Sequence, residues 1–271
     1  VAACLSGLTI DLYRPAVSAM IADLVAPEDR ARAFALLYWA INLGVAVAGV
    51  TGGLLAARSY WLLFIFDAAT CLAFAVLIAR KVPETRPARQ AGEQGGYGQA
   101  VRGGLLLTLS AALLLGTIVY MQSFVTLPLA VAADGLGPEA YGLIYAVNPV
   151  VVIVAQIGVL RVIDRLPGVP TLAISTVIMG VGFGLTAVAS SVPFYMLTVV
   201  VWTLGEIGFN AVGPAMVADI APAHLRGRYN GVFGMSFGAA ALVAPLVGTQ
   251  VFANYGETAL WAGCLVLSIV S

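Results

Sequence analysis

Charged residues are scarce in this chain of 271 residues, because Asp, Glu, Lys and Arg make up only 10% of it while hydrophobic residues make up 61%. One soluble core could not bury so much apolar side chain, so lipid must solvate much of the protein. The formal net charge is zero and gives no sign of a nucleic-acid partner. The single histidine stands outside any metal-binding motif, so we expect no metal and no cofactor.

Cysteine is also rare, and Cys4, Cys71 and Cys264 all fall inside apolar runs. A free thiol there behaves as a small hydrophobic group, so we expect no disulfide. The chain starts at Val1 inside one apolar run and stops at Ser271 inside another, without an initiator methionine or signal peptide. We therefore expect both ends to be truncated.

Long apolar runs dominate the rest of the sequence, and each can cross a hydrocarbon core, which takes about 20 helical residues. Backbone groups in lipid must bond within their own segment, and these runs lack the alternation of a barrel strand. The sequence therefore predicts an all-α polytopic membrane protein. The nine predicted spans are 1–26, 33–56, 60–82, 103–132, 137–160, 169–188, 193–221, 229–253 and 257–271, the last one short.

The segment 83–98 (PETRPARQAGEQGGYG) is polar and rich in Gly and Pro, which is typical of a linker between two helical bundles. Eleven of the thirteen Lys and Arg residues fall on this linker and on alternate connections, against Arg58 on the other side and Arg14 inside a span. The positive-inside rule places the Arg-rich side in the cytoplasm. We expect a multi-pass protein of the plasma membrane with a cytoplasmic linker.

An internal repeat relates the two ends of the chain. A shift of about 196 residues places the first two predicted spans on the seventh and eighth. Helices six apart thus correspond with the same topology, which is the plan of transporters whose site lies between two repeats. The shift superposes Met20, Ala22, Asp23, Arg30 and Arg32 on Met216, Ala218, Asp219, Arg226 and Arg228.

The stretch PAVSAMIADL at 15–24, followed by Pro27 and by RARA at 30–33, resembles helix 4 and the next loop of the major facilitator superfamily. Its copy is PAMVADIAPAHLRGR at 214–228. The resemblance implies a truncated two-bundle fold of about nine transmembrane helices. In it, 1–82 is the remaining part of the N-terminal bundle (helices 4–6), 83–98 is the cytoplasmic linker, and 99–271 is the C-terminal bundle (helices 7–12).

Within the superfamily, DLYRP at 11–15, YMQ at 120–122 and YGL at 141–143 resemble the drug:proton antiporter branch. The helix-5 segment AGVTGG at 48–53 departs from that branch because the proline of its motif is missing. The basic residue of the helix-4 motif would fall at Ala3, so the resemblance gives Arg14 no proton role.

Charged residues within a span are costly, about 2.5–3.5 kcal/mol at a helix centre, and so mark candidate functional sites. Asp11 and Arg14 share a helix face and could form a substrate or ion pathway, or alternatively a structural ion pair. Glu206 falls one position from the repeat-mate of Asp11, and Asn210 is the repeat-mate of Arg14.

Low-dielectric surroundings favour a neutral carboxyl group, so Glu206, Asp11 or Asp67 could bind and release a proton near neutral pH. We favour Glu206, because Asp11 has a cation beside it that should keep it ionised. Asp67 could equally be an interfacial or packing residue.

Polar points on otherwise apolar helices would orient a small amphipathic substrate, although each alone could simply hold helices together. These candidates are Tyr38, Asn42, Tyr120, Gln122, Asn148 and Gln156. Opposite charges at the cytoplasmic helix ends could form an inside gate of salt bridges, or the arginines could be anchors in water. The candidate gate residues are Asp23, Arg30, Arg32, Asp164, Arg165, Asp219, Arg226 and Arg228.

Two small-residue pairs, Gly180 with Gly184 and Gly234 with Gly238, predict close contacts between helices. The second pair lies in GMSFG at 234–238, which also matches the nucleophile motif of serine hydrolases. That stretch lacks the strand–turn–helix context that exposes such a serine, so we expect no enzyme.

These features predict a monomeric secondary transporter in a lipid bilayer that exchanges protons for a small, partly hydrophobic molecule by alternating access. The resemblance implies efflux, as in multidrug resistance. A metabolite importer of the same fold and a receptor-like member without transport are the alternatives.

Overall fold

The computed structural model describes residues 13–82 and 104–271, and every regular element in these ranges is helical. Asp11, the linker 83–98 and the side chain of Arg14 lie outside the described part of the chain. The N-terminal group consists of α2 (Tyr13–Leu24), α3 (Arg30–Arg58) and α4 (Tyr60–Lys81). The C-terminal group consists of α6 (Gly104–Val125), α7 (Leu127–Ala133), α8 (Pro138–Ile163), α9 (Gly168–Leu185), α10 (Val192–Ile220), α11 (Arg226–Tyr255) and α12 (Glu257–Val270).

Seven of the described helical segments are long and apolar enough to cross a membrane, and the shorter apolar helices α2 and α12 accompany them. The helices begin and end at residues that suit their termini. Ser59 accepts a hydrogen bond from the Trp61 backbone N–H at the start of α4, with N···O 3.3 Å. Gly256, at φ +86°, joins α11 to α12 in a conformation that residues with a Cβ rarely adopt. The all-helical, polytopic fold class predicted from the sequence is therefore confirmed.

The predicted span 103–132 differs from the structure, which divides it into α6 and α7 at Thr126. Pro128 follows this point and has no N–H to bond to the preceding turn of helix. The Thr126 hydroxyl instead donates to the Gln122 side-chain oxygen at 2.9 Å. The division thus follows from a proline that is plain in the sequence.

The core of the C-terminal group lies where α9, α10 and α12 meet. The rings of Phe183 and Trp202 stack with centroids 5.3 Å apart, and the rings of Phe183 and Trp261 stack with centroids 6.2 Å apart. A Cβ added at Gly182 would lie 2.3 Å from the Trp202 backbone nitrogen, and one at Gly205 would lie 2.3 Å from the Ser175 carbonyl oxygen. These two glycines therefore permit α9 and α10 to pack backbone against backbone.

The two predicted glycine pairs differ in whether a described helix lies close to them. A Cβ at Gly180 would lie 2.3 Å from the Ser268 Cβ of α12, so the close contact predicted there is confirmed. A Cβ at Gly234 or Gly238 would meet no described atom within 4 Å, so the described residues show no close helix contact at this pair. GxxxG spacing permits contact between helices but does not show which helix face is covered.

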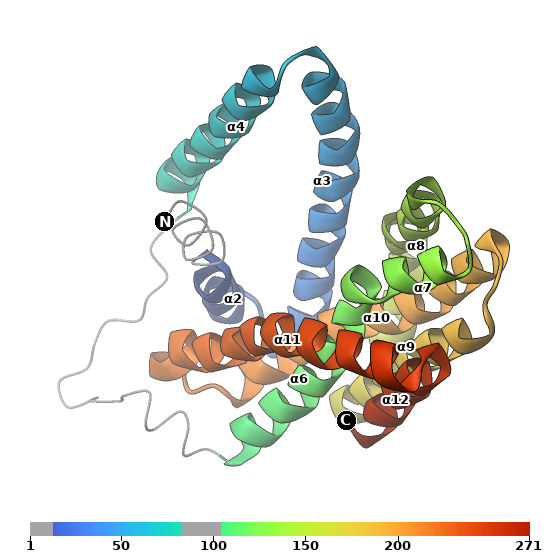
Figure 1. Cartoon of the computed structure of the whole chain (residues 1–271). Coiled ribbons are helices and arrows are strands. Elements are labelled where there is room, and N and C mark those ends of the chain that lie inside the picture. The colour runs from blue at the N-terminus through green and yellow to red at the C-terminus, as the bar shows by residue number, and fades with distance from the viewer. Residues whose placement is uncertain (1–12, 83–103) are drawn as a thin grey trace.

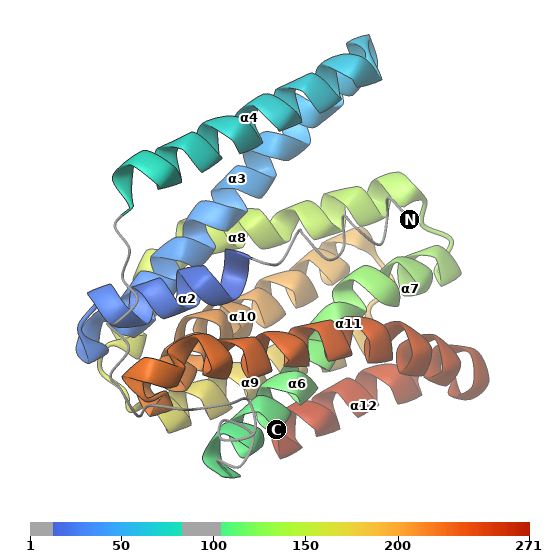
Figure 2. The same cartoon turned by 90° about the vertical axis from the view of Figure 1, so that its left-hand side faces the viewer.

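The N-terminal group meets the C-terminal group along a limited surface. The first part of α3 packs on α8 and α10, and α2 packs on α11 and α10. Phe34 and Ala35 near the start of α3 are buried, whereas the described side chains after Asn42 are half-buried or exposed. Figures 1 and 2 show the consequence: α3 starts against the C-terminal group and diverges from it toward its own C-terminus, with α4 following it back.

Candidate functional site

A carboxylate lies fully buried between the two helical groups. Glu206, in the middle of α10, has no exposed surface. Its Oε1 accepts a hydrogen bond from the Tyr38 hydroxyl of α3 at 2.5 Å, and its Oε2 accepts one from the Asn148 amide of α8 at 2.6 Å. Three helices that are distant in the sequence thus converge on one acidic side chain.

Neutral polar groups extend this site. The Asn148 amide nitrogen also donates to the Thr203 hydroxyl at 3.0 Å, which uses both of its N–H groups and fixes its orientation. Tyr120 of α6 and Tyr145 of α8 interact electrostatically with the Glu206 carboxylate. Within the described residues, the titratable neighbours of Glu206 are tyrosines, and no cation balances its charge there.

Aromatic rings form one side of the site. Tyr120 meets Trp202 edge-on at a centroid separation of 6.1 Å and Phe124 at 5.6 Å. Phe124 in turn contacts Tyr145 at 5.2 Å, and Tyr145 contacts Tyr141 at 5.9 Å. Such a cluster offers apolar faces together with hydroxyl groups, which suits an amphipathic molecule.

Three other predicted site residues, described next, do not bond to the Glu206 carboxylate. Asn210 donates to the Glu206 carbonyl oxygen at 3.1 Å, and Asn42 donates to the Tyr38 carbonyl oxygen at 3.0 Å, so both amides bond to backbone rather than to the carboxylate. Asp67 is exposed on α4, a helix that packs on α3, and the structure does not bring it to Glu206.

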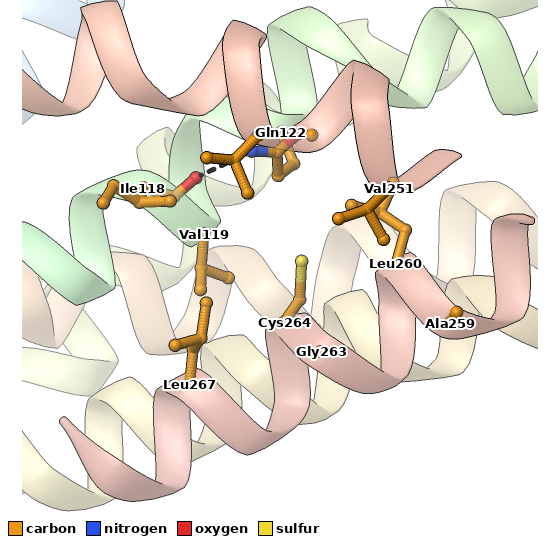
Figure 3. Close-up of a pocket in the computed structure, with 11 residues that line it drawn as sticks. Ile118, Val119, Gln122, Val251, Ala259, Leu260, Gly263, Cys264 and Leu267 are labelled. Carbon is orange, nitrogen blue, oxygen red and sulfur yellow. Dashed lines mark hydrogen bonds between the residues drawn. The ribbon is translucent and has the colours of Figure 1, made fainter. Parts of the chain in front are cut away.

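Gln122 lies apart from Glu206 and joins α6 to α11. Its amide donates to the Ile118 and Ala244 carbonyl oxygens, each at 3.2 Å. It borders a small apolar cavity of about 80 Å³ between α6, α11 and α12, shown in Figure 3. Val119, Val251 and Cys264 are among the lining residues, so this cavity offers few polar groups to a ligand.

Ion pairs join the two groups at the Arg-rich end. Arg30 Nη1 lies 2.5 Å from Asp219 Oδ1, and Arg30 Nη2 donates to the Ala22 carbonyl oxygen at 2.8 Å. Arg226 pairs with Asp23. Asp23 and Asp219 are repeat-mates, as are Arg30 and Arg226, so each half of the repeat supplies the acid for the other half's arginine.

The other predicted gate residues take no part in these two ion pairs. Arg32 is exposed, as are Asp164 and Arg165 in the turn after α8, and Arg228 is half-buried. The structure thus brings together four of the eight candidates.

A further set of contacts lies between the ion pairs and Glu206. Gln156 of α8 donates to the Ala35 carbonyl oxygen of α3. The indole N–H of Trp39 donates to the Ile153 carbonyl oxygen of α8 at 3.3 Å. We did not single out Trp39 or Thr203 from the sequence. A tryptophan inside an apolar helix is a usable signal, because its buried N–H needs an acceptor.

Together, the fold and the site define a polytopic helical membrane protein whose polar centre lies between two sequence-related groups of helices. Comparison with known proteins agrees with this class. A model of the Major Facilitator Superfamily matches residues 1–168 and again 113–271. The chain belongs to this superfamily.

Curated relatives share low sequence identity with the chain. The chain is 27% identical over 264 residues to the uncharacterized MFS-type transporter YttB of Bacillus subtilis, covering 95% of this chain and 66% of the relative. It is 22% identical over 277 residues to a Na⁺, Li⁺, K⁺/H⁺ antiporter of Planococcus maritimus, covering 91% and 65%. The chain thus spans about two thirds of the length of these curated relatives.

Among solved structures, the human organic anion transporter MFSD10 (TETRAN) superposes with a TM-score of 0.75 at 18% identity. The match covers 93% of this chain and 66% of that one. At this identity the likeness establishes the fold alone.

Proposed function

We propose that the protein is a proton-coupled secondary transporter that exports small, partly hydrophobic molecules, with Glu206 as its proton-binding residue. The observation that carries this proposal is a fully buried carboxylate at the contact between the two helical groups, surrounded by neutral donors among the described residues. Ionisable residues inside a membrane are costly and typically mark ion or substrate pathways. A carboxylate held by neutral groups can bind a proton without first breaking an ion pair.

Alternating access gives the two ion pairs a role as the inside gate. They join the N-terminal and C-terminal groups at the Arg-rich end, which we assign to the cytoplasmic side together with the linker 83–98. In the described arrangement the groups are in contact at this end and diverge along α3 toward the other. Rocking the groups about the level of Glu206 would break the pairs and expose the carboxylate to the cytoplasm.

Substrate binding is assigned to the aromatic cluster beside Glu206. Tyr120, Tyr145 and Phe124 belong to this cluster, Tyr38 donates to one oxygen of the carboxylate, and Asn148 donates to the other. This combination suits a molecule with an apolar body and a positive charge. We further propose that the protein acts as a monomer in the plasma membrane.

One relative favours a second candidate cargo. The printed name of the Planococcus maritimus protein describes exchange of Na⁺, Li⁺ or K⁺ for protons. Oxygen atoms of Glu206, Tyr38 and Thr203 are the kind of ligand that a small alkali cation accepts. An alkali cation is therefore the alternative to an organic cation. Import of a metabolite and a receptor role without transport are further alternatives, less favoured than either cation.

Transport by the whole protein in proteoliposomes under an imposed pH gradient tests the proposal. The cargo panel should contain lipophilic cationic dyes in one arm and Na⁺ or K⁺ in another. We expect Glu206→Gln to reduce transport to the level of empty liposomes, and Glu257→Gln, which changes a carboxylate at the start of α12, to retain it. If folded wild-type protein moved neither cargo under the gradient, or if Glu206→Gln kept full coupling, the proposal would be withdrawn.

A further inference from the structure

The hydrogen bond from Tyr38 to Glu206 crosses between the two helical groups. Tyr38 belongs to α3 of the N-terminal group, and its hydroxyl oxygen lies 2.5 Å from Glu206 Oε1. The other bonded partner of the carboxylate, Asn148, belongs to the C-terminal group together with Glu206 itself. Movement of one group against the other therefore breaks the Tyr38 bond and leaves the Asn148 bond in place.

The start of α3 connects this bond mechanically to the ion pair between Arg30 and Asp219. Arg30 begins α3, and Tyr38 lies eight residues further along, about 12 Å up the helix axis. Between them, Gln156 bonds to the Ala35 carbonyl oxygen, and Trp39, the residue after Tyr38, bonds to the Ile153 carbonyl oxygen. One rigid helix thus carries every one of these contacts, so α3 cannot leave the Arg-rich end without removing Tyr38 from Glu206.

We propose that Tyr38 is the positioning residue that links the protonation state of Glu206 to closure of the two groups. This inference rests on the proposed proton role of Glu206. A hydroxyl group bonds to an ionised carboxylate roughly twice as strongly as to a neutral carboxyl group. The Tyr38 bond exists only in the closed arrangement, so it stabilises that arrangement more when Glu206 is ionised than when Glu206 carries a proton.

The other groups that face Glu206 do not share this property. Tyr120 comes from α6, Tyr145 and Asn148 come from α8, and Thr203 lies on α10 itself. All four belong to the C-terminal group and move with Glu206. Their hydrogen bonds and fields affect proton binding in both arrangements, whereas the Tyr38 hydroxyl acts in the closed arrangement alone.

A purely structural role for Tyr38 predicts a different result. If the hydroxyl served only packing, its removal would weaken closure equally at every pH. If it links protonation to closure, its removal weakens closure chiefly where Glu206 is ionised, and the effect disappears when residue 206 cannot ionise. A double-mutant cycle measured against pH separates these two cases.

The test measures the distance between spin labels across the Arg-rich end of the whole protein in lipid nanodiscs. Labels are attached at Glu28→Cys, before α3, and at Arg165→Cys, after α8, because both positions are exposed. Cys4, Cys71 and Cys264 are replaced by alanine in every variant. Electron–electron double resonance then gives the closed-to-open ratio as a function of pH for wild type, Tyr38→Phe, Glu206→Gln and the double variant.

We expect Tyr38→Phe to lower the closed-to-open ratio about tenfold at high pH, the size of one charge-assisted hydrogen bond, and much less at low pH. In the Glu206→Gln background, the same change should have a small effect that does not vary with pH. Tyr195→Phe is the matched control, because that hydroxyl bonds to the Asp134 carboxylate at 2.7 Å within the C-terminal group. The control should leave the ratio unchanged.

Two outcomes would overturn the inference, and they can be told apart. If Glu206→Gln removes the pH dependence but Tyr38→Phe acts equally at all pH values, Glu206 keeps its proton role and Tyr38 loses its linking role. If Glu206→Gln leaves the pH dependence of the ratio unchanged, the proton role of Glu206 fails, and the inference fails with it.

Discussion

The two polar regions between the helical groups handle charge in opposite ways. At the Arg-rich end, acids and arginines form ion pairs, and the Asp219 side chain keeps 47% of its surface exposed while Arg30 keeps 7%. Around Glu206, a fully buried carboxylate is held by neutral hydroxyl and amide groups. An ion pair at the edge can separate into water at modest cost, whereas an ionised group in the interior loses its solvation.

Under the proposed function, this difference explains why a gate and a proton site would occupy different levels of one interface. The end that would open repeatedly has contacts that water can replace. The centre that would change its protonation state has an acid without a fixed counter-ion among the described residues. The following predictions would break or sharpen this comparison, in order of decreasing effect.

The largest effect is expected at the centre. Glu206→Gln keeps the shape of the side chain but cannot bind or release a proton, and it replaces one of the two oxygens that accept from Tyr38 and Asn148 with an NH₂ donor. We expect transport of the cationic cargo under an imposed pH gradient to disappear, as measured in proteoliposomes. Retention of proton-driven transport would show that the buried carboxylate of Glu206 does not carry the coupled proton.

The next largest effect is expected from a charge reversal at the gate. Asp23→Arg places two arginines together across the groups, and we expect closure at the Arg-rich end to be lost in spin-label distance measurements. Adding Arg226→Asp restores opposite charges in exchanged positions, so the double variant should regain much of the closed population. Failure of this rescue would mean that these side chains do not act as a pair.

Loss of either gate ion pair should weaken closure, but by different amounts. Side-chain exposure is 20% for Arg226 and 13% for Asp23, whereas Asp219 is 47% exposed, so water can replace Asp219 more readily. Asp23→Ala should therefore reduce closure more than Asp219→Ala, whose loss we expect at about 0.5–1 kcal/mol. Equal losses in the same distance measurement would contradict an effect of burial.

The smallest effect is expected between the two regions. Trp39→Phe keeps the aromatic ring but removes the N–H that donates to the Ile153 carbonyl oxygen. We expect closure to weaken by about 0.5–1.5 kcal/mol, the typical value of one neutral hydrogen bond. The loss should be the same at all pH values, in contrast to that of Tyr38→Phe, because Trp39 contacts no ionisable group through this bond.

Much of the fold could be predicted from the sequence because the membrane imposes simple rules on it. Helix positions followed from long apolar runs, and most predicted spans match described helices closely. The division at Thr126 was missed although Pro128 signals it. The close contacts at Gly182 and Gly205 were missed because glycine is frequent in the chain, and only packing shows which glycines face a neighbouring helix.

The candidate site could be predicted in part. Glu206, Tyr38 and Asn148 were named because polar residues are rare on these helices, yet their mutual contact joins positions up to 168 residues apart. The same polarity also selected Asp67, which is exposed on α4, and Gln122, which joins α6 to α11. Polarity in an apolar helix indicates that a partner is needed, but it does not say which one.

The sequence by itself determined the helices, the repeat and the identity of the residues that had to find polar partners, because apolar length and the cost of charge in lipid act locally along the chain. Tertiary structure alone decided which partners met. The repeat supplied two acids and two arginines, and packing of α3 on α10 and of α2 on α11 exchanged them between the halves. The same packing placed the Tyr38 hydroxyl on Glu206, since only the approach of α3 to α10 brings them within bonding distance.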